Sequence, residues 1–428
     1  MLIEFTVGNY RSFKEKVTFS MVAAPITAQY PKLDENNVFA VDDKLKLLKS
    51  AAIYGANASG KSNLAKALNF MKSLILNSSK ETQSTSNISV ENFRLDEEFV
   101  SKPSLFEIVF LMDAQQYRYG FEVNPKEIVA EWLYYVPSKR ETKLFTRELD
   151  KFNIAKKYDT EGRQKLTRQN ALFLSASDQF NLDIASRILG WIKINLNIIS
   201  GLSDEDYLNV TLKCIENDTN KAEIIQLIKN LDLAIHDVRV EQAEFPVDAL
   251  APFLSDDFRK HIKDSESHKT PFAITLHRKF DKEKKFTALE QFMLLNQESE
   301  GTKKIFALAG PLVDTLKKGK VLIIDEFDAR LHPLISRAIV EMFNSNETNP
   351  NNAQLIFMTH DTNLLDNRLF RRDQIWFTEK DQYGATDLYS LAEYKVRKDA
   401  SFEKDYIKGK YGAIPYLGDL SNLIESHG

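Results

Sequence analysis

The 428-residue sequence contains one cysteine, Cys214. A lone thiol excludes an internal disulfide and any CxxC metal site, and this scarcity is typical of proteins of a reducing cytoplasm. No apolar stretch approaches the roughly 20 residues that a membrane-spanning helix needs. Residues Met1–Phe5 lead directly into strand-like sequence, without a signal peptide. We therefore expect a soluble cytoplasmic protein with no membrane contact.

A large excess of charge of one sign is also missing. The chain has 57 lysines and arginines and 61 aspartates and glutamates, which gives a net charge of -4. This balance excludes the general basic field of proteins that coat DNA. The most basic stretch, residues 139–168, interleaves its cations with acids. That pattern favours a solvated surface, and a nucleic-acid contact stays open as the alternative. The absence of long heptad runs excludes a coiled-coil arm.

What is present begins with a complete P-loop, Gly55-Ala56-Asn57-Ala58-Ser59-Gly60-Lys61-Ser62, which matches G-x-x-x-x-G-K-[ST]. A short apolar strand (51–54) precedes the loop, and a helix with one apolar face (63–76) follows it. Glycines in such a loop let backbone N–H groups surround phosphate oxygens at a helix N-terminus. Lys61 would bridge the β- and γ-phosphates of ATP, and the Ser62 hydroxyl would hold Mg²⁺.

A second feature is the apolar run Val321–Glu326, which ends in two carboxylates. Four aliphatic residues predict a central strand whose C-terminal end lies at the ligand cleft. Asp325 would bind Mg²⁺, commonly through water, and Glu326 would orient and deprotonate the attacking water. Two adjacent carboxylates suit hydrolysis better than transfer to another substrate.

Two short motifs surround this strand. Ser299-Glu300-Gly301 precedes a helix with an apolar stripe (302–316), and Thr359-His360-Asp361 follows an apolar strand (354–358). Taken alone, Ser299 indicates only a helix N-cap and His360 only a histidine at a strand end. Their order around the carboxylate strand is what favours phosphate-binding roles for both.

This set of motifs resembles the ATP-binding cassette ATPases of the SMC, RecF and overcoming-lysogenization type, often classed as AAA-like ATP-binding proteins of bacterial defence loci. The resemblance covers about residues 1–125 and 290–395. It implies an α/β fold, an ABC-type P-loop head with a mixed sheet and a flanking antiparallel β-subdomain. It also implies ATP contacts for Arg11 and Ser12 of the N-terminal turn and for Gly55, Asn57, Ala58, Ser59, Gly60, Lys61, Ser62 and Asn63.

The same resemblance implies that two chains share each ATP. Ser299 and Gly301 match the signature motif that reads the γ-phosphate bound to the opposite protomer. Asp328 matches the D-loop at the dimer interface, and His360 matches the switch histidine near the γ-phosphate. One departure is Glu300, which replaces a signature glycine and would repel phosphate unless it is paired or turned away. No glutamine loop is identifiable, and the segment Asn92-Phe93-Arg94 is the nearest candidate.

These patterns predict four segments. Residues 1–145 form the N-terminal part of the ATPase core, with an antiparallel sheet from Phe93 to about Phe145. Residues 146–288 form a mainly helical insertion that ends in two charged strands around a helical loop. Residues 289–395 complete the core, and residues 396–428 form a tail that would dock a partner. Near the tail, Arg371-Arg372 is either a solvated turn or a dock for an acidic partner or a phosphate.

The function we expect is the ATPase subunit of a bacterial anti-phage, abortive-infection system. It would form a head-to-tail homodimer with two composite ATP sites, a higher assembly being left open, and would gate a separate effector, a nuclease of the RloB type or another. The defence role rests on resemblance alone. Two alternatives stay open: a RecF-like DNA-repair ATPase that clamps DNA, and an ATP-stabilised scaffold with little hydrolysis. Glu300 disfavours a transporter motor.

Overall fold

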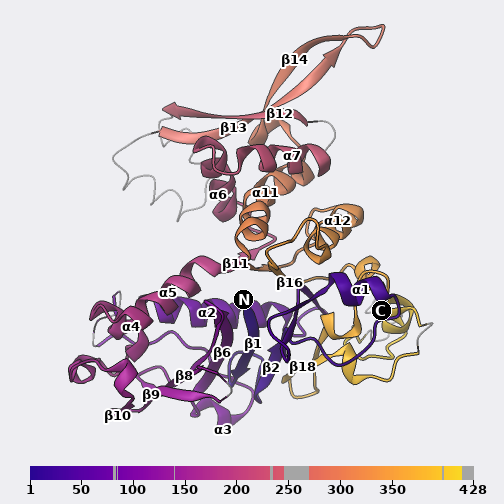
Figure 1. Cartoon of the computed structure of the whole chain (residues 1–428). Coiled ribbons are helices and arrows are strands. Elements are labelled where there is room, and N and C mark those ends of the chain that lie inside the picture. The colour runs from indigo at the N-terminus through magenta and orange to yellow at the C-terminus, as the bar shows by residue number, and fades with distance from the viewer. Residues whose placement is uncertain are drawn as a thin grey trace, which may run out of the picture. The chain divides into compact units, whose positions relative to one another are not determined.

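The computed structural model describes residues 1–80, 83, 85–138, 140–231, 235–244, 269–397 and 400–416. The chain forms two compact units (Figure 1). The first comprises residues 1–201, 315–328 and 336–428, and the second comprises residues 202–314 and 329–335. The expected insertion, 146–288, is thus divided between them, because residues up to 201 add strands to both sheets of the first unit.

The first unit contains a six-stranded sheet in which five neighbouring strands are parallel and the last is antiparallel. Its order is β11 (Leu196–Ser200), β15 (Val321–Asp325), β16 (Gln354–Met358), β5 (Ser50–Gly55), β17 (Ile375–Lys380) and β18 (Thr386–Ser390). Buried parallel strands are mainly apolar, and β15 is apolar up to Asp325 at its end, while β16 is apolar after Gln354 at its start. The C-terminal ends of β5, β15 and β16 therefore lie at one edge of the sheet.

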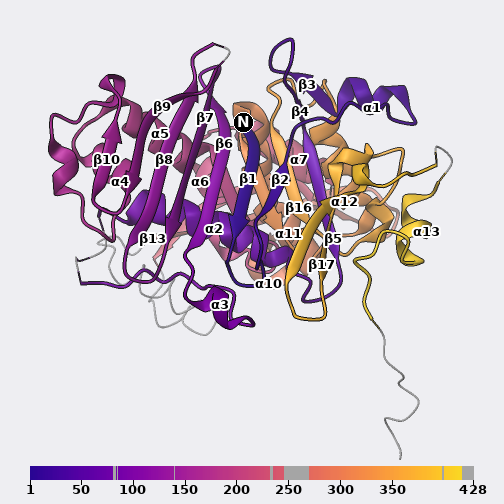
Figure 2. The ribbon, with the colours of Figure 1, turned by 90° about the horizontal axis from the view of Figure 1, so that it is seen from below.

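A seven-stranded antiparallel sheet completes this unit and confirms the expected β-subdomain (Figure 2). Its order is β10 (Lys151–Ile154), β9 (Thr142–Glu148), β8 (Ile128–Val136), β7 (Gln115–Val123), β6 (Ser104–Met112), β1 (Leu2–Gly8) and β2 (Val17–Ser20). The predicted helix after the P-loop is α2 (Lys61–Asn77), whose buried Leu64, Leu68 and Met71 share one core with both sheets. The α/β fold with a mixed sheet is confirmed.

A buried ion pair ties the antiparallel sheet to α4 (Phe173–Gln179). The Glu131 carboxylate accepts the backbone N–H groups of Phe173 and Leu174 at 2.6 and 2.9 Å. Arg147, whose guanidinium lies 3.7 Å from Glu131, donates to the carbonyl of Ala171 at 2.7 Å. Both side chains are buried. Arg147 is therefore a structural cation and is not available to the surface that the basic stretch suggested.

The first unit also contains further α-helices and one small hairpin. The helices are α1 (Pro31–Asn36), α3 (Glu97–Val100), α5 (Asp183–Asn195) and α13 (Phe402–Ile407), and α12 (Pro333–Asn344) begins in the second unit and ends in the first. The hairpin pairs β3 (Val38–Ala40) with β4 (Lys46–Leu48). No helix in the described part of the chain is long and apolar enough to cross a membrane.

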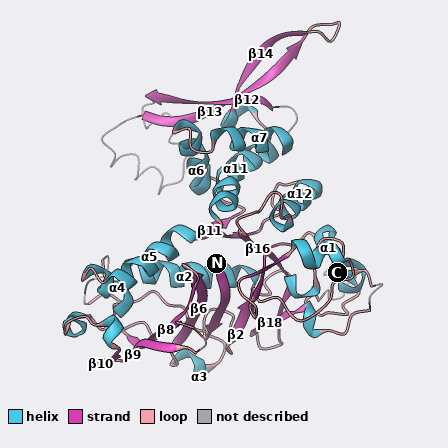
Figure 3. Ribbon diagram, in the orientation of Figure 1, coloured by secondary structure: helices cyan, strands magenta, loops and turns pink. Residues whose placement is uncertain are grey.

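The second unit combines helices with a three-stranded antiparallel sheet (Figure 3). The strands are β12 (Ile235–Glu244), β13 (Lys269–Phe280) and β14 (Phe286–Met293), and the helices are α6 (Glu205–Glu216), α7 (Lys221–Leu231), α10 (Leu294–Gln297) and the first part of α11 (Glu300–Lys318). Leu212, Ile228, Val238 and Phe306 share its core. The two charged strands expected here are β12 and β13, and the helical loop predicted between them lies outside the described residues.

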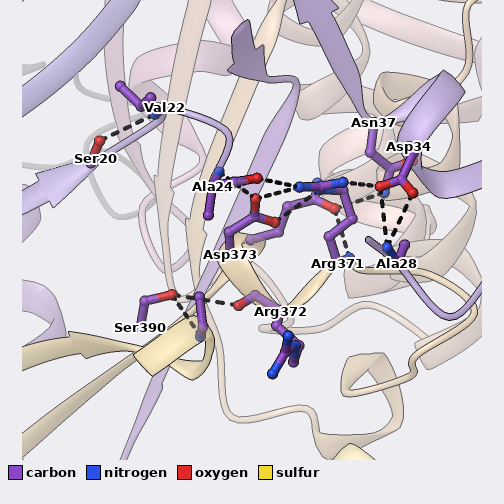
Figure 4. A network of polar contacts seen from close by, with 12 residues as sticks. Ser20, Val22, Ala24, Ala28, Asp34, Asn37, Arg371, Arg372, Asp373 and Ser390 are labelled. Atoms are coloured by element: carbon purple, nitrogen blue, oxygen red, sulfur yellow. Dashed lines mark hydrogen bonds and ion pairs between the residues drawn. The ribbon is translucent and has the colours of Figure 1, made fainter. Parts of the chain in front are cut away.

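Arg371 is neither a solvated turn nor a docking cation, so both interpretations of this residue were wrong (Figure 4). Its guanidinium is buried, donates to the Asp373 carboxylate at 3.0 and 2.7 Å, and also pairs with Asp34. The Asp373 carboxylate accepts the backbone N–H of Ala24 at 2.8 Å. This network fastens the N-terminal segment to the start of β17.

Replacing Arg371 with methionine should lower the free energy of unfolding of the first unit by about 3 kcal/mol, because Asp373 would stay buried without its counter-charge. Urea unfolding followed by tryptophan fluorescence measures this, since the first unit contains all three tryptophans, Trp132, Trp191 and Trp376. Arg368→Met removes an exposed arginine nearby and serves as the control, with an expected change under about 0.5 kcal/mol. Equal effects of the two substitutions would refute this role.

Candidate functional site

The P-loop connects the end of β5 to the start of α2, and its conformation requires glycine at positions 55 and 60. Gly60 has φ +114°, a value that side chains rarely tolerate, and Ala58 has φ 62°. A Cβ on Gly60 would also lie 3.0 Å from the Ser12 hydroxyl. A Cβ on Gly55 would collide with Ser59 and Thr378. The loop is therefore wrapped tightly, with backbone close to its neighbours.

A cavity of about 450 Å³ lies over this loop, entirely within the first unit. It brings together most of the residues predicted from the sequence. Its lining consists of Asn57, Ala58, Ser59, Gly60, Lys61, Ser62, Asn63, Asp325, Glu326, Met358, Thr359, His360 and Lys380. The parallel sheet explains this meeting, because β5, β15 and β16 end at the same edge.

Lys61 is one of two lysines that line the cavity. Its Nζ donates to the carbonyl oxygens of Gly55 and Ala56 at 2.8 and 3.0 Å. Burial lowers the pKa of Lys61 to about 8, against the opposing effect of the nearby carboxylates, of which Asp325 has the largest influence. A phosphate chain would restore the ordinary preference for the charged form.

Affinity for ATP should therefore fall as the pH rises through the pKa of free Lys61, about 8. Bound phosphates raise this pKa, so binding above pH 8 must take up a proton, and affinity should be about tenfold weaker at pH 9 than at pH 7. Calorimetric titration with a non-hydrolysable ATP analogue and Mg²⁺ measures this. The matched control Lys61→Arg keeps its charge and should show a flat profile. A flat wild-type profile from pH 7 to 9.5 would contradict the expectation.

The Ser62 hydroxyl donates to the Asp325 carboxylate at 3.1 Å, which places these two oxygen atoms side by side. Hydroxyl and carboxylate oxygens are the donors that Mg²⁺ takes when substrate phosphates and waters complete its octahedron. The described residues contain no group of three or more His, Cys, Asp or Glu that could hold a metal by themselves. A magnesium ion would therefore fit here together with a nucleotide.

Glu326 follows β15 at the cavity, and the turn that carries it is bonded to the end of β16. Glu326 has φ 52°, in the left-handed region. Phe327 donates its N–H to the carbonyl of Met358 at 3.0 Å. The Asp328 carboxylate accepts the Thr359 hydroxyl at 2.6 Å and the His360 N–H at 3.3 Å. The carboxylate turn and the segment around His360 therefore form one hydrogen-bonded group.

His360 is among the residues that line this cavity. Partial burial, and then the positive charge of Lys61, lower the pKa of His360 below its ordinary value. The ring is therefore neutral at pH 7, with one nitrogen to donate and one to accept a hydrogen bond. A neutral ring can contact a phosphate oxygen or a water beside it.

The N-terminal turn lies beside the loop but does not line the cavity. The Ser12 hydroxyl accepts a hydrogen bond from the Asn63 side chain at 2.7 Å. The Arg11 guanidinium pairs with Glu91 at 2.5 Å. Ser12 thus supports the start of α2, and Arg11 is held by a carboxylate of its own unit.

Ser299, Glu300 and Gly301 belong to the second unit and are not among the residues that line the cavity. The Ser299 hydroxyl accepts the Thr302 N–H at 3.1 Å, so it caps α11. The Glu300 carboxylate pairs with Lys303 at 2.8 Å and Arg330 at 3.2 Å, and these cations lower its pKa. The charge that departs from the signature pattern is therefore paired within its own unit.

Sequence reasoning missed the residues of β17 and β18 that support the loop. Lys380, at the end of β17, lines the cavity. The Thr378 hydroxyl bonds the Ser59 hydroxyl at 2.7 Å, and the Thr386 hydroxyl donates to the Ser59 carbonyl at 2.8 Å. The apolar run before Thr378 could have indicated these residues, because it is followed by polar residues, as the apolar runs of β15 and β16 are. The glutamine-loop candidate, Asn92-Phe93-Arg94, is not part of the cavity lining.

Comparison with known proteins gives one family and several similar structures. The family described as "AAA domain, putative AbiEii toxin, Type IV TA system" matches residues 50–366. Among curated proteins, none matches the chain. The SMC head bound to the C-winged helix domain of ScpA is 13% identical with a TM-score of 0.42, and the match covers 91% of this chain and 97% of that one.

Two further structures are similar at the same level of sequence identity. The SMC head domain from Thermotoga maritima is 12% identical with a TM-score of 0.40, and the match covers 92% of this chain and 99% of that one. CbiO1 from Clostridium perfringens, part of the ABC transporter complex cbiONQ, is 11% identical with a TM-score of 0.31, covering 96% and 92%.

Proposed function

The chain belongs to the family of AAA domains that matches residues 50–366, and on that premise we propose that it binds ATP with Mg²⁺ and hydrolyses it to ADP and phosphate. The observation that carries the proposal is the cavity that joins the P-loop to Asp325 at the end of β15 and to Glu326, which follows it. Its cation, hydroxyl and carboxylates are the groups that phosphoryl transfer to water requires.

Five residues of the cavity would have distinct tasks in this reaction. Lys61 would turn from the carbonyls of its own loop to the phosphate oxygens, and Ser62 with Asp325 would hold Mg²⁺. The ion supplies neutralisation of the charge that develops on the phosphates. Glu326 would accept a proton from the attacking water and orient it. His360, neutral at pH 7, would hydrogen-bond the γ-phosphate.

We further propose that ATP joins two chains head to tail. Ser299 and Gly301 of one chain would meet the γ-phosphate held by the other, and Asp328 would lie at the interface. The pairing of Glu300 with Lys303 and Arg330 supports this proposal, because it removes the repulsion that the carboxylate would otherwise exert on phosphate.

The biological role we propose is bacterial defence against phage, with the ATP-bound dimer controlling a separate effector, a nuclease. The family description supports it, since it refers to AbiEii toxins of type IV TA systems. Protection against phage by the native gene cluster tests this role. Lys61→Ala should abolish both ATP turnover by the purified protein and protection of the host.

The same assays separate the rival functions. Protection that survives Lys61→Ala would contradict the defence proposal. ATP binding without turnover in the wild-type protein would favour the scaffold, and nanomolar, ATP-dependent, salt-sensitive DNA binding would favour the repair ATPase. Burial of Arg147 removes one cation from the stretch that suggested a nucleic-acid contact.

A further inference from the structure

A glycine outside all of the motifs lies against the turn that carries Glu326. Gly201 directly follows β11, and the register of β11 with β15 pairs Ser200 with Asp325. The N–H of Gly201 donates to the carbonyl of Asp325 at 2.6 Å. Gly201 itself is buried. The backbone of the two carboxylate residues therefore rests directly on this glycine.

No space remains at Gly201 for a side chain. A Cβ built there would lie 2.7 Å from the carbonyl carbon of Glu326 and 2.9 Å from the carbonyl oxygen of Asp325, and would overlap the carbonyl oxygen of Glu326. The obstacle is backbone, which cannot move aside as a flexible side chain would. Gly201 does not adopt a left-handed φ, so an added methyl group would be opposed by the neighbouring peptide and not by its own conformation.

The turn beyond Gly201 has no freedom to move away. Glu326 adopts φ 52°, a conformation that a residue with a side chain keeps only where its surroundings fix it. The turn is also held by the bonds from Phe327 to Met358 and from Thr359 to Asp328. A methyl group at Gly201 must therefore displace the Glu326 peptide or break these bonds.

We propose that Gly201 is a positioning residue of the ATPase site. Because glycine has no side chain, the Glu326 peptide can pack against it, and this position directs the Glu326 carboxylate toward the attacking water. The inference rests on the proposed function, because it assigns Gly201 to the step in which Glu326 accepts a proton. Catalytic groups must be held to about half an ångström, and a displacement of about 1 Å can slow the step about 100-fold. The contacts that we propose for Lys61 and Ser62 with ATP do not involve Gly201.

The test compares Gly201→Ala with Gly190→Ala in steady-state ATP hydrolysis. Gly190 lies in α5 of the same unit, and a Cβ built there meets no atom within 4 Å, so it is a matched control. For Gly201→Ala we expect kcat to fall between about 10- and 100-fold while KM and the ATP dissociation constant stay within about twofold. Gly190→Ala should match the wild type.

A double variant distinguishes positioning from general damage. In single-turnover hydrolysis of radiolabelled ATP, the double variant Gly201→Ala, Glu326→Gln should be no slower than Glu326→Gln alone. Both substitutions remove the same contribution, which is proton acceptance by a correctly placed Glu326 carboxylate. Losses that multiply, or a Gly201→Ala protein that loses ATP affinity along with kcat, would overturn the proposal. Unchanged kcat in Gly201→Ala while Glu326→Gln is inactive would overturn it and leave the proposed function standing. Wild-type protein without turnover would overturn both.

A measurement on the wild-type protein tests the contact even if Gly201→Ala does not fold. In hydrogen–deuterium exchange, the Gly201 amide should exchange as slowly as the amides of β15, because it donates to the carbonyl of Asp325. Rapid exchange at Gly201 would overturn the proposal.

Discussion

Glu326→Gln is expected to bind ATP with wild-type affinity and to hydrolyse it at least about 100-fold more slowly. Glutamine has the shape of glutamate but cannot accept the proton of the attacking water. Lys61, Ser62 and Asp325, which we propose hold the phosphates and the metal ion, are unchanged by the substitution. Binding and chemistry should therefore separate at this one residue.

Parallel measurements of the ATP dissociation constant and of kcat test this separation. Glu347→Gln is a suitable control, since it makes the same chemical change at an exposed position after α12 and should keep full turnover. Glu326→Gln with more than about a tenth of wild-type turnover would show that another group takes the proton. Loss of ATP binding in the same variant would indicate a structural role for Glu326.

The parts of the site that follow long apolar strands could be predicted from the sequence. The strand that ends at Gly55, the strand before Glu326 and the strand that ends at Met358 each contain four consecutive buried apolar residues, which local sequence shows directly. Because parallel strands end at one edge, the polar residues that follow them were expected to meet. The P-loop, the two carboxylates and His360 all line the same cavity, and their roles toward ATP stay predictions.

Contacts that depend on distant partners could not be predicted. Strand β11 begins directly after α5, without a turn signal, so the sequence does not mark a strand within this mainly helical region. With β11 unseen, Gly201 had no visible connection to Glu326. Arg371 likewise seemed exposed, because its partner Asp34 lies 337 positions away in the sequence. Whether a charged side chain is buried depends on its partners in the tertiary structure, and these cannot be predicted from the local sequence.

Two inactive variants are expected to restore each other if the ATP site is composite. Ser299→Asp should abolish turnover, because aspartate can still cap α11 while its charge repels a γ-phosphate held by the partner chain. Lys61→Ala should abolish turnover by losing the phosphates of its own chain. In a dimer with one chain of each kind, one of the two sites combines an intact P-loop with an intact Ser299.

Co-expression with two different affinity tags, followed by tandem purification, yields this mixed dimer. Its turnover should be about half that of the wild-type dimer, since a two-fold symmetric assembly has two equivalent sites and one of them is intact. Ser299→Thr keeps both the hydroxyl and the helix cap, so as the matched control it should retain turnover. If the mixed dimer is no more active than either variant alone, each site is complete within one chain. If Ser299→Asp alone is fully active, Ser299 contacts no phosphate and serves only as the cap of α11.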